Sequence, residues 1–505
     1  MARVHEVLIV GSGFGGSVAA VRLAEAGVDV TLVERGPWRD TLPVRSMGIP
    51  NRVRYPAGGQ LLLRGLKRVN GRFVPAAGMT LSRYGLFEYF SAGDLAALCA
   101  SGVGGGSHVY MALNDRPRVP DFWGNRHPEL SSGAMEEHYQ RISAEMGGRA
   151  PRPEDAIPNL TTTRYREHPA FRAGEPADRP IHAVQFPETP GTSREVDWRD
   201  GIRRRECDWK DGGLLGSRFG TKATLDFCYL APAMRRGLRV LDLHEAVSVH
   251  RCRQTATARY CVQVKNLYTG RVEPFYAEHV MLAAGTMNTL RLLFVSRDEA
   301  RGLDGMPALG RRFSTNGNCT AWWSLDTPGA DYSRGLPCHG TVALREPLDD
   351  DPPFVIEVGL VGADGLPLPR SWRERLRRDI VLVAMGADAA DGVASMDRGR
   401  LRVRYDTARS PVYARARAMF RRMEDISGKR VRILKRNLTM QPLGGAVLGD
   451  GPEQGVVDAA GEVVGNPGLF VLDAAALPAA PGGPPAMSVA AWSSHVAARF
   501  LLARQ

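Results

Sequence analysis

Lysine is scarce in this chain: only six of the 66 basic residues are lysine, and the rest are arginine. The arginines are spread through every segment, and no block of five or six like charges occurs. No nucleic-acid-binding motif accompanies the formal charge of +12. The sequence therefore argues against nucleic acid as a partner, although the net charge alone would suggest one.

The chain has few cysteines, and their number and spacing show no sign of disulfide pairs or metal-binding pairs. The seven cysteines are odd in number and contain no C-x-x-C pair, which argues against a disulfide framework and against a zinc site. There is also no H-E-x-x-H spacing and no Ser-His-Asp order, so neither a metal site nor a hydrolase is predicted. We expect a chain that works in a reducing compartment, with no metal.

Long hydrophobic runs are missing as well. No stretch of 18 apolar residues occurs, so we expect no stable membrane insertion. The first apolar run, Val4–Val10, begins a nucleotide-binding pattern rather than a cleavable leader. We therefore expect a cytoplasmic protein. At 505 residues, 44% of them hydrophobic, the chain can bury a large core and form two or more domains.

What the sequence does contain begins at its N-terminus. Val4–Val10 leads into a glycine-rich turn, and a helix-like segment follows as far as Gly27. Asp29–Val33 then has the pattern of a second buried strand, and it ends at Glu34, about 20 residues beyond the glycines. The turn carries the three glycines of the dinucleotide fingerprint: Gly11, Gly13 and Gly16. These features together predict a binding site for an adenine dinucleotide.

The middle of the chain has a different character. Residues 41–90 are rich in Gly, Pro and Arg, which is typical of an excursion covering the fold, with a lid over a pocket as one possible role. Residues 102–110 contain a second glycine-rich run, which implies close backbone approach to something flat or charged. We expect a hairpin within Val247–Val264 and an antiparallel block over 319–410, the latter built from five short strands: Thr320–Leu325, Thr341–Leu344, Phe354–Leu360, Ile380–Ala384 and Arg400–Tyr405.

The end of the chain returns to a nucleotide-fold pattern. Gly468–Asp473 reads as a buried strand, a Pro/Gly-rich turn follows at 478–485, and Met487–Leu502 reads as a closing helix. The first and last segments therefore belong to one domain, and a second domain is inserted between them.

These motifs give the chain a resemblance to the glucose–methanol–choline (GMC) flavin oxidoreductases, and most closely to their bacterial cholesterol-oxidase branch. The matching pieces occur in the family's order along nearly the whole chain: Gly11–Gly16 with Glu34-Arg35-Gly36, Gly102–Ser107, Gly220–Leu225, Ala283–Thr286, Leu309–Phe313, Pro442–Gly445, and Leu472-Asp473 before Pro478 and Pro485.

The resemblance implies an α/β fold, in which an FAD-binding Rossmann-type domain is interleaved with an antiparallel-sheet substrate domain. The FAD-binding part would comprise residues 1–40, 95–115, 205–318 and 436–505. The substrate part would comprise 41–94, 116–204 and 319–435. The cofactor would be FAD, held by Gly11, Gly13, Phe14, Gly15, Gly16, Glu34, Arg35, Gly102, Gly104, Gly105, Gly106, Ser107, Ala246, Ala284, Gly285, Asp473, Ala474, Pro485, Ala486 and Met487. Asp473 could instead cap a turn.

The chain departs from the family at the substrate site. The family's catalytic histidine before Pro-Leu-Gly-Gly is Gln441 here, and the polar residue that usually accompanies it falls on Pro484. A glutamine side chain cannot accept a proton near neutral pH, and a proline has neither a side-chain donor nor an N–H. His108 and Tyr110 in the second glycine-rich run are further catalytic candidates, each with a structural alternative. Relatives that bond flavin to a histidine in this run have it at the position of Val109.

Three explanations stay open. The enzyme could oxidise a substrate that needs no strong base, it could use FAD to shape a pocket for a redox-neutral cyclisation or rearrangement, or it could have lost catalysis. We expect oxidation of a hydroxyl or activated C–H on a bulky apolar small molecule, sterol- or polyketide-like, by hydride transfer to flavin N5. The redox-neutral flavoprotein, a cyclase or isomerase of a specialised metabolite, is the alternative. The sequence leaves the oligomeric state open.

Overall fold

A parallel sheet carries the N-terminal motif. In the computed structural model, which describes residues 3–93, 95–172, 180–252, 257–362 and 365–504, the strands follow the order β10-β2-β1-β13-β12-β11, and β22 also pairs with β13. The parallel members are β1 (Val4–Val10), β2 (Val30–Glu34), β10 (Arg239–Asp242), β13 (Val272–Leu282) and β22 (Leu469–Val471). β11 (His244–Arg251) and β12 (Tyr260–Asn266) extend the sheet as the expected antiparallel hairpin; residues 253–256 lie outside the described chain.

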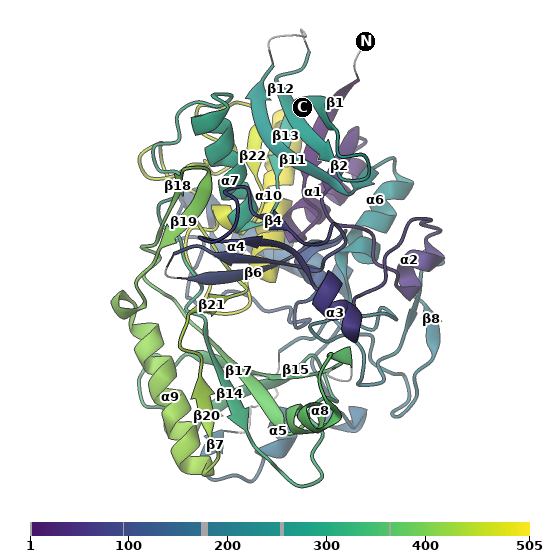
Figure 1. Cartoon of the computed structure of the whole chain (residues 1–505), viewed down its shortest axis with the longest axis vertical. Helices are drawn as coiled ribbons and strands as arrows, with labels where there is room; N and C mark the ends of the chain where they lie inside the picture. Colours follow the sequence, from purple (N-terminus) through teal and green to yellow (C-terminus); the bar gives the residue numbers. More distant parts are fainter. Residues whose placement is uncertain (1–2, 94, 173–179, 253–256, 363–364, 505) are drawn as a thin grey trace.

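Helices from the two ends of the chain pack together on this sheet. They are α1 (Phe14–Glu25) and α10 (Ala486–Arg504), and α4 (Ser132–Met146) packs against α10. Small residues let them approach closely: Ser493 Oγ donates to the Gly15 carbonyl at 2.5 Å. Trp492 Nε1 donates to the Val471 carbonyl of β22 at 2.9 Å. Figure 1 shows purple α1 beside yellow α10, with both termini at the same end of the molecule. Segments from the two ends of the chain thus lie against the same sheet.

The second sheet is the expected antiparallel block. Its order is β20-β14-β17-β16-β15-β7, made from β20 (Val431–Ile433), β14 (Cys319–Ser324), β17 (Asp379–Met385), β16 (Phe354–Gly359), β15 (Cys338–Leu344) and β7 (Phe171–Arg172). α9 (Pro411–Ser427) packs against β14, β17 and β20 with its apolar stripe. The last expected strand lies outside this sheet: β19 (Arg400–Arg404) pairs antiparallel with β18 (Val393–Asp397) in a separate hairpin.

A third sheet lies between the other two (Figure 1) and has the order β21-β6-β5-β3-β4. It contains β3 (Leu66–Asn70), β4 (Met79–Thr80), β5 (Phe87–Ser91), β6 (Ala96–Ala100) and β21 (Leu438–Thr439). The segment 41–90 is thus more than a covering excursion, since it supplies three strands. β5 and β6 pair across the expected boundary between residues 94 and 95.

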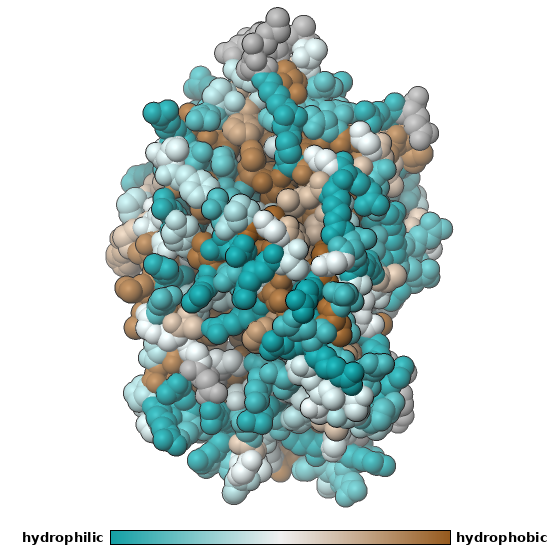
Figure 2. Space-filling view, turned by 90° about the vertical axis from the view of Figure 1, so that its right-hand side faces the viewer, coloured by the Kyte–Doolittle hydropathy of each residue, from teal (hydrophilic) through white to brown (hydrophobic). Residues whose placement is uncertain are grey.

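The remaining elements are short connections. They are α2 (Leu42–Ser46), α3 (Gly59–Arg64), α5 (Thr161–Arg164), α6 (Ala231–Arg235), α7 (Thr286–Phe294), α8 (Arg370–Leu376), β8 (Glu195–Asp197) and β9 (Arg203–Arg205). Single turns of tighter or wider helix occur at Gly105–His108, Pro128–Leu130, Pro153–Asp155, Asp226–Leu230, Val295–Glu299, Thr407–Arg409 and Ala474–Ala476. Within the described chain, no helix combines the length and apolar character needed to cross a bilayer. Figure 2 shows one face covered mostly by hydrophilic side chains, with only small hydrophobic areas between them.

Candidate active site

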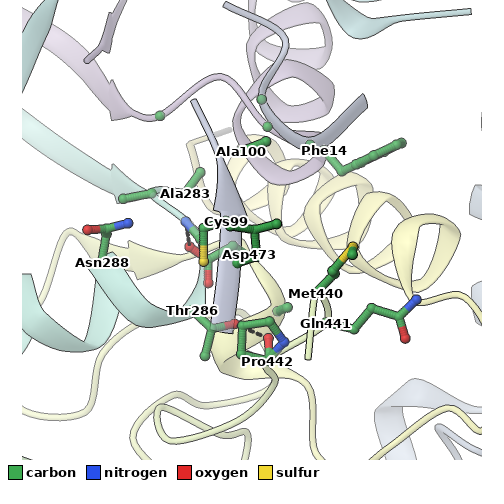
Figure 3. A pocket seen from close by; sticks show the side chains of 18 of the residues that line it. Phe14, Cys99, Ala100, Ala283, Thr286, Asn288, Met440, Gln441, Pro442 and Asp473 are labelled. Carbon is green, nitrogen blue, oxygen red and sulfur yellow. Dashed lines mark hydrogen bonds between the residues drawn. The ribbon is translucent and has the colours of Figure 1, made fainter. Parts of the chain in front are cut away.

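A cavity of about 730 Å³ lies where the three sheets meet. Figure 3 shows part of its lining, to which Phe14, Cys99, Asp473 and Gln441 contribute from four separate segments. We call the part around the glycine-rich turns the glycine half. We call the part bounded by the antiparallel sheet the sheet half; its wall includes the side chains of Thr320, Ile356, Val358, Val381 and Val383. Alternate residues of β14, β16 and β17 point into the cavity. Most of these residues are Val or Ile, so the wall is mainly apolar.

The first glycine-rich turn is built for close backbone approach. Gly11 has φ +98°, and a Cβ there would collide with the Ala283 carbonyl of the neighbouring strand. A Cβ on Gly15 would lie 2.5 Å from the Leu472 carbonyl oxygen, and one on Gly16 would overlap the Gly11 carbonyl. A Cβ on Gly13, in contrast, would meet no protein atom within 4 Å and would project into free space. The turn therefore packs tightly against protein on one side and leaves room for a ligand on the other.

Glu34 ends β2 beside this turn and is held in place by three donors. Ser12 donates to its Oε2 through the backbone N–H at 3.0 Å and the hydroxyl at 2.8 Å, and the Gly36 N–H donates to Oε1 at 2.7 Å. Glu34 lines the cavity, and a carboxylate offers about four lone-pair positions, so it retains capacity to accept from ribose hydroxyls. Arg35 also lines the cavity and pairs with the buried Glu88.

The second glycine-rich run lies against the first. The Gly104 N–H donates to Ser12 Oγ at 3.0 Å, and a Cβ on Gly105 would lie 2.7 Å from the Gly13 Cα. Gly105 and Gly106 line the cavity, and a Cβ on Gly106 would meet no protein atom within 4 Å. Five expected cofactor residues are absent from the described lining: Gly16, Gly102, Gly104, Ser107 and Met487.

His108 is placed away from the lining, with both ring nitrogens engaged. Nε2 lies 2.5 Å from the Val103 carbonyl oxygen, which can only accept, so Nε2 carries the proton. Nδ1 then accepts from the Tyr55 hydroxyl at 2.7 Å. Burial lowers the pKa of His108 to about 3, so the ring is neutral near physiological pH. This placement favours the structural role over the catalytic one.

Tyr110 lines the cavity at the edge of the Phe14 ring, with 5.5 Å between ring centroids. Its hydroxyl donates to the Ala223 carbonyl at 2.9 Å, and burial raises its pKa well above the ordinary value. Lys222 anchors the same loop by donating to the carbonyls of His108 and Tyr110 at 2.9 and 3.0 Å. Tyr110 thus offers the cavity a rigid ring rather than a proton acceptor.

Asp473 follows β22 and ties two turns of the glycine half together. Its Oδ2 accepts from the Gly285 N–H at 2.8 Å and from the Thr289 hydroxyl at 2.5 Å, and its Oδ1 accepts from the Ala475 N–H at 2.9 Å. Burial raises its pKa, which the donors only partly offset. The turn-capping role is therefore present in the structure. The other expected residues of this region also line the cavity: Ala246, Ala284, Gly285, Ala474, Pro485 and Ala486.

Gln441 and Pro484 both line the cavity. Gln441 Oε1 accepts from Asn316 Nδ2 at 2.8 Å and from Asn318 Nδ2 at 3.1 Å. Figure 3 shows its amide nitrogen turned to the side of the cavity where Phe14 lies. Sequence reasoning missed both asparagines, although they follow shortly after the recognised motif Leu309–Phe313.

A charged cluster at the far end of the glycine half was also missed. Arg68 of β3 pairs with Glu245 of β11 through two bonds of 2.6 and 2.8 Å, and both side chains line the cavity. Burial alone would raise the pKa of Glu245, but the Arg68 guanidinium more than offsets this and holds that pKa at about 2. No local sequence signal pairs these residues, because Arg68 and Glu245 are 177 positions apart in the chain.

Comparisons with known proteins agree with this geometry. Residues 382–493 match a family model described as GMC oxidoreductase, and residues 4–53 match one described as FAD binding domain. The chain is also 25% identical to a cholesterol oxidase of Mycobacterium tuberculosis, in an alignment that covers 98% of this chain and 90% of that protein. The chain is thus similar to the GMC oxidoreductases. Together these matches support an FAD-dependent oxidoreductase that resembles cholesterol oxidase in its overall sequence.

Solved structures of two enzymes share the fold of this chain. Pyridoxine 4-oxidase from Mesorbium loti superposes with a TM-score of 0.61 at 17% identity, covering 99% of both chains. A fungal aryl-alcohol oxidase superposes with a TM-score of 0.59 at 14% identity, covering 100% of both chains. At these identities the likeness establishes the fold alone.

The residues that line this cavity fit FAD. Gly13, Gly106 and Gly285 all line the cavity, and a Cβ on any of them would project into space that no protein atom fills. Gly13 begins α1 without a side-chain cap, so the N–H groups of the first turn are available to a phosphate. Pro485 and Ala486 bring the start of α10 to the same cavity.

Proposed function

We propose that this protein oxidises a hydroxyl or an activated C–H bond of a bulky, largely apolar molecule, sterol- or polyketide-like. Bound FAD would supply the two-electron acceptor, taking a hydride at N5. The observation that carries the substrate class is the apolar wall of the sheet half, which is continuous with the buried cluster formed by Leu113, Cys338, Ile356, Val358 and Met385. The cholesterol-oxidase likeness supports the same class.

The chain's own residues would divide the work between the two halves of the cavity. The glycine turns and Glu34 would bind the nucleotide part of FAD. Gln441, Pro484 and Tyr110 would face the substrate and hold its reactive carbon in position. The apolar wall would exclude water from that carbon.

We place the enzyme in the cytoplasm. Its seven cysteines are free, and its first apolar run belongs to the nucleotide-binding pattern.

A second function is favoured by one observation: neither Gln441 nor Pro484 can take a proton. Losing a positioned base typically costs about 10²- to 10⁴-fold in rate. Tyr110 and His108 do not compensate, since both are committed to protein partners. A redox-neutral cyclase or isomerase of a specialised metabolite, in which FAD shapes the pocket, needs no such base for hydride transfer.

Anaerobic mixing separates these functions. The FAD-loaded protein would be mixed with a panel of apolar alcohols and of ketones with activated C–H bonds, while flavin absorbance and products are followed. Bleaching of the visible flavin band in step with product formation is the result expected for oxidation. Product that forms while the flavin stays oxidised would support the redox-neutral function. An unchanged flavin and unchanged ligands throughout the panel would contradict both functions for this substrate class.

A further inference from the structure

The orientation of the Gln441 amide is fixed by a chain of hydrogen bonds that starts at the backbone. The Gly482 N–H donates to Asn316 Oδ1 at 3.2 Å, and Asn316 Nδ2 donates to the Gly483 carbonyl at 2.8 Å. A backbone N–H can only donate and a carbonyl can only accept, so the two ends of the Asn316 amide cannot be exchanged. The second proton of Asn316 Nδ2 therefore points to an acceptor on Gln441, which must be Oε1.

Asn318 supplies a second donor to the same oxygen of Gln441. Its Oδ1 accepts from the Thr439 hydroxyl at 3.0 Å, and its Nδ2 donates to Gln441 Oε1 at 3.1 Å. Asn316 and Asn318 are both nearly inaccessible to solvent, at 0% and 3% exposure, so water does not compete for these bonds. Two amide donors thus occupy Gln441 Oε1. The remaining end of the side chain, Nε2 with its two protons, is the part available to a ligand.

This arrangement distinguishes a carbonyl from a hydroxyl. A carbonyl oxygen can accept from Gln441 Nε2 and has no proton of its own to place. A hydroxyl can accept the same bond, but Gln441 Oε1 is already occupied by two donors and Pro484 has no acceptor in its side chain, so neither of these two residues accepts the hydroxyl proton. A buried donor without a partner is costly, which amounts to a preference of about 10-fold or more for the carbonyl compound.

We propose that Gln441 recognises the substrate of this enzyme by donating Nε2–H to a carbonyl oxygen, so that the pocket selects an apolar ketone over the matching alcohol. Asn316 and Asn318 are the positioning residues. The inference rests on the proposed function in one respect: the substrate occupies the sheet half of the cavity beside the cofactor. The inference narrows the proposed function to carbonyl compounds. In these compounds the carbonyl group is adjacent to the carbon at which the enzyme oxidises a C–H bond or closes a ring.

The test uses matched pairs of ligands: a tetralone with its tetralol, a decalone with its decalol, and a saturated steroid ketone with its alcohol. Binding to the FAD-loaded protein is measured anaerobically from the perturbation of the oxidised flavin spectrum. We expect the ketone to bind at least about 10-fold more tightly than its alcohol in the pairs that fit. Equal binding, tighter binding of the alcohols, or failure of every ketone to bind would overturn the inference.

Two variants of Gln441 make the test specific. Gln441→Met keeps the length of the side chain but removes the donor, so ketone affinity should fall about 10-fold, to the level of the alcohol. Gln441→Glu leaves one oxygen for the asparagines and turns an acceptor toward the ligand, so the preference should invert. Gln60→Glu, on the exposed side of α3, is the matched control and should keep the ketone preference. A preference that survives Gln441→Met contradicts the inference, even if the Glu variant fails to fold.

The outcome is separable from that of the proposed function. Flavin bleaching by an alcohol, together with equal binding of ketones and alcohols, would refute the inference and leave the oxidase function standing. Ketone preference without any bleaching would uphold the inference and favour the redox-neutral function.

Discussion

At Gly13 a single methyl group would enter space that the cofactor needs. Its φ of −70° suits any residue, and a Cβ there meets no protein atom within 4 Å, so Gly13→Ala should fold normally. We expect FAD affinity to fall about 10- to 100-fold, as for an overpacked contact. FAD content after purification and titration of the cofactor-free protein would measure this.

Gly133→Ala is the matched control, because Gly133 also has free space for a Cβ and lies in the first turn of α4. It should retain FAD and raise the free energy of unfolding by about 0.5–1 kcal/mol. If Gly13→Ala bound FAD as well as the control, the glycine half would not be the cofactor site.

Gly16→Ala should fail in a different way. The added Cβ would overlap the Gly11 carbonyl, so α1 must move away from this turn even when no ligand is bound. We expect a loss of at least about 1–3 kcal/mol in the free energy of unfolding, measured in urea without added FAD. A variant that lost FAD while keeping its stability would show that Gly16 contacts the cofactor rather than the strand.

The residues of the site differ in how far the sequence could predict them. The glycines and Glu34 were predictable because a local spacing dictates their geometry. Gln441 was identified by position, but the direction of its amide depends on Asn316 and on two backbone groups at 482 and 483, which only the fold brings together. The sequence made His108 a catalytic candidate, but in the structure both of its ring nitrogens bind protein groups, the Tyr55 hydroxyl and the Val103 carbonyl. These bonds give the histidine a structural role.

Among elements, β3 and β11 are joined by the Arg68–Glu245 pair, which links the middle sheet to the parallel sheet. The pKa of Glu245 falls from 4.5 to about 2 on folding, so between these values the unfolded chain binds more protons than the folded one. Stability therefore rises with pH across this window and is lost on acidification. The shift corresponds to about 3 kcal/mol.

Glu245→Gln should remove this dependence. We expect the wild type to exceed the variant in unfolding free energy near neutral pH, and the difference to shrink by up to about 3 kcal/mol between pH 5 and pH 2. Urea unfolding at several pH values would measure it, with Glu137→Gln on the exposed side of α4 as control. A difference that stayed constant with pH would mean that the pair does not set the pKa of Glu245.

The strands of this middle sheet were the part of the fold that the sequence predicted least well. β3 and β5 are parallel although only 16 residues separate their ends, and β21 joins β6 from more than 300 residues away. Short strands in a Gly/Pro-rich segment carry little periodic signal, and their pairing is decided by tertiary packing. The sheets of 4–34 and 319–385 were predictable because their apolar patterns are long or regular.

For the whole molecule, the cavity joins segments from both ends of the chain to the antiparallel sheet, so its two halves should respond to different ligands. Adding FAD should slow amide hydrogen exchange in the glycine turns, where the first turn of α1 has N–H groups available to a phosphate, and at the start of α10, which lines the same cavity. Adding a saturated steroid ketone to the FAD-loaded protein should then slow exchange in β16 and β17, which wall the sheet half. In Gly13→Ala the first response should weaken while the native exchange pattern of β16 and β17 persists. Protection by FAD alone across the whole antiparallel sheet, with no further change on adding the ketone, would mean that the cofactor fills both halves and that the substrate binds elsewhere.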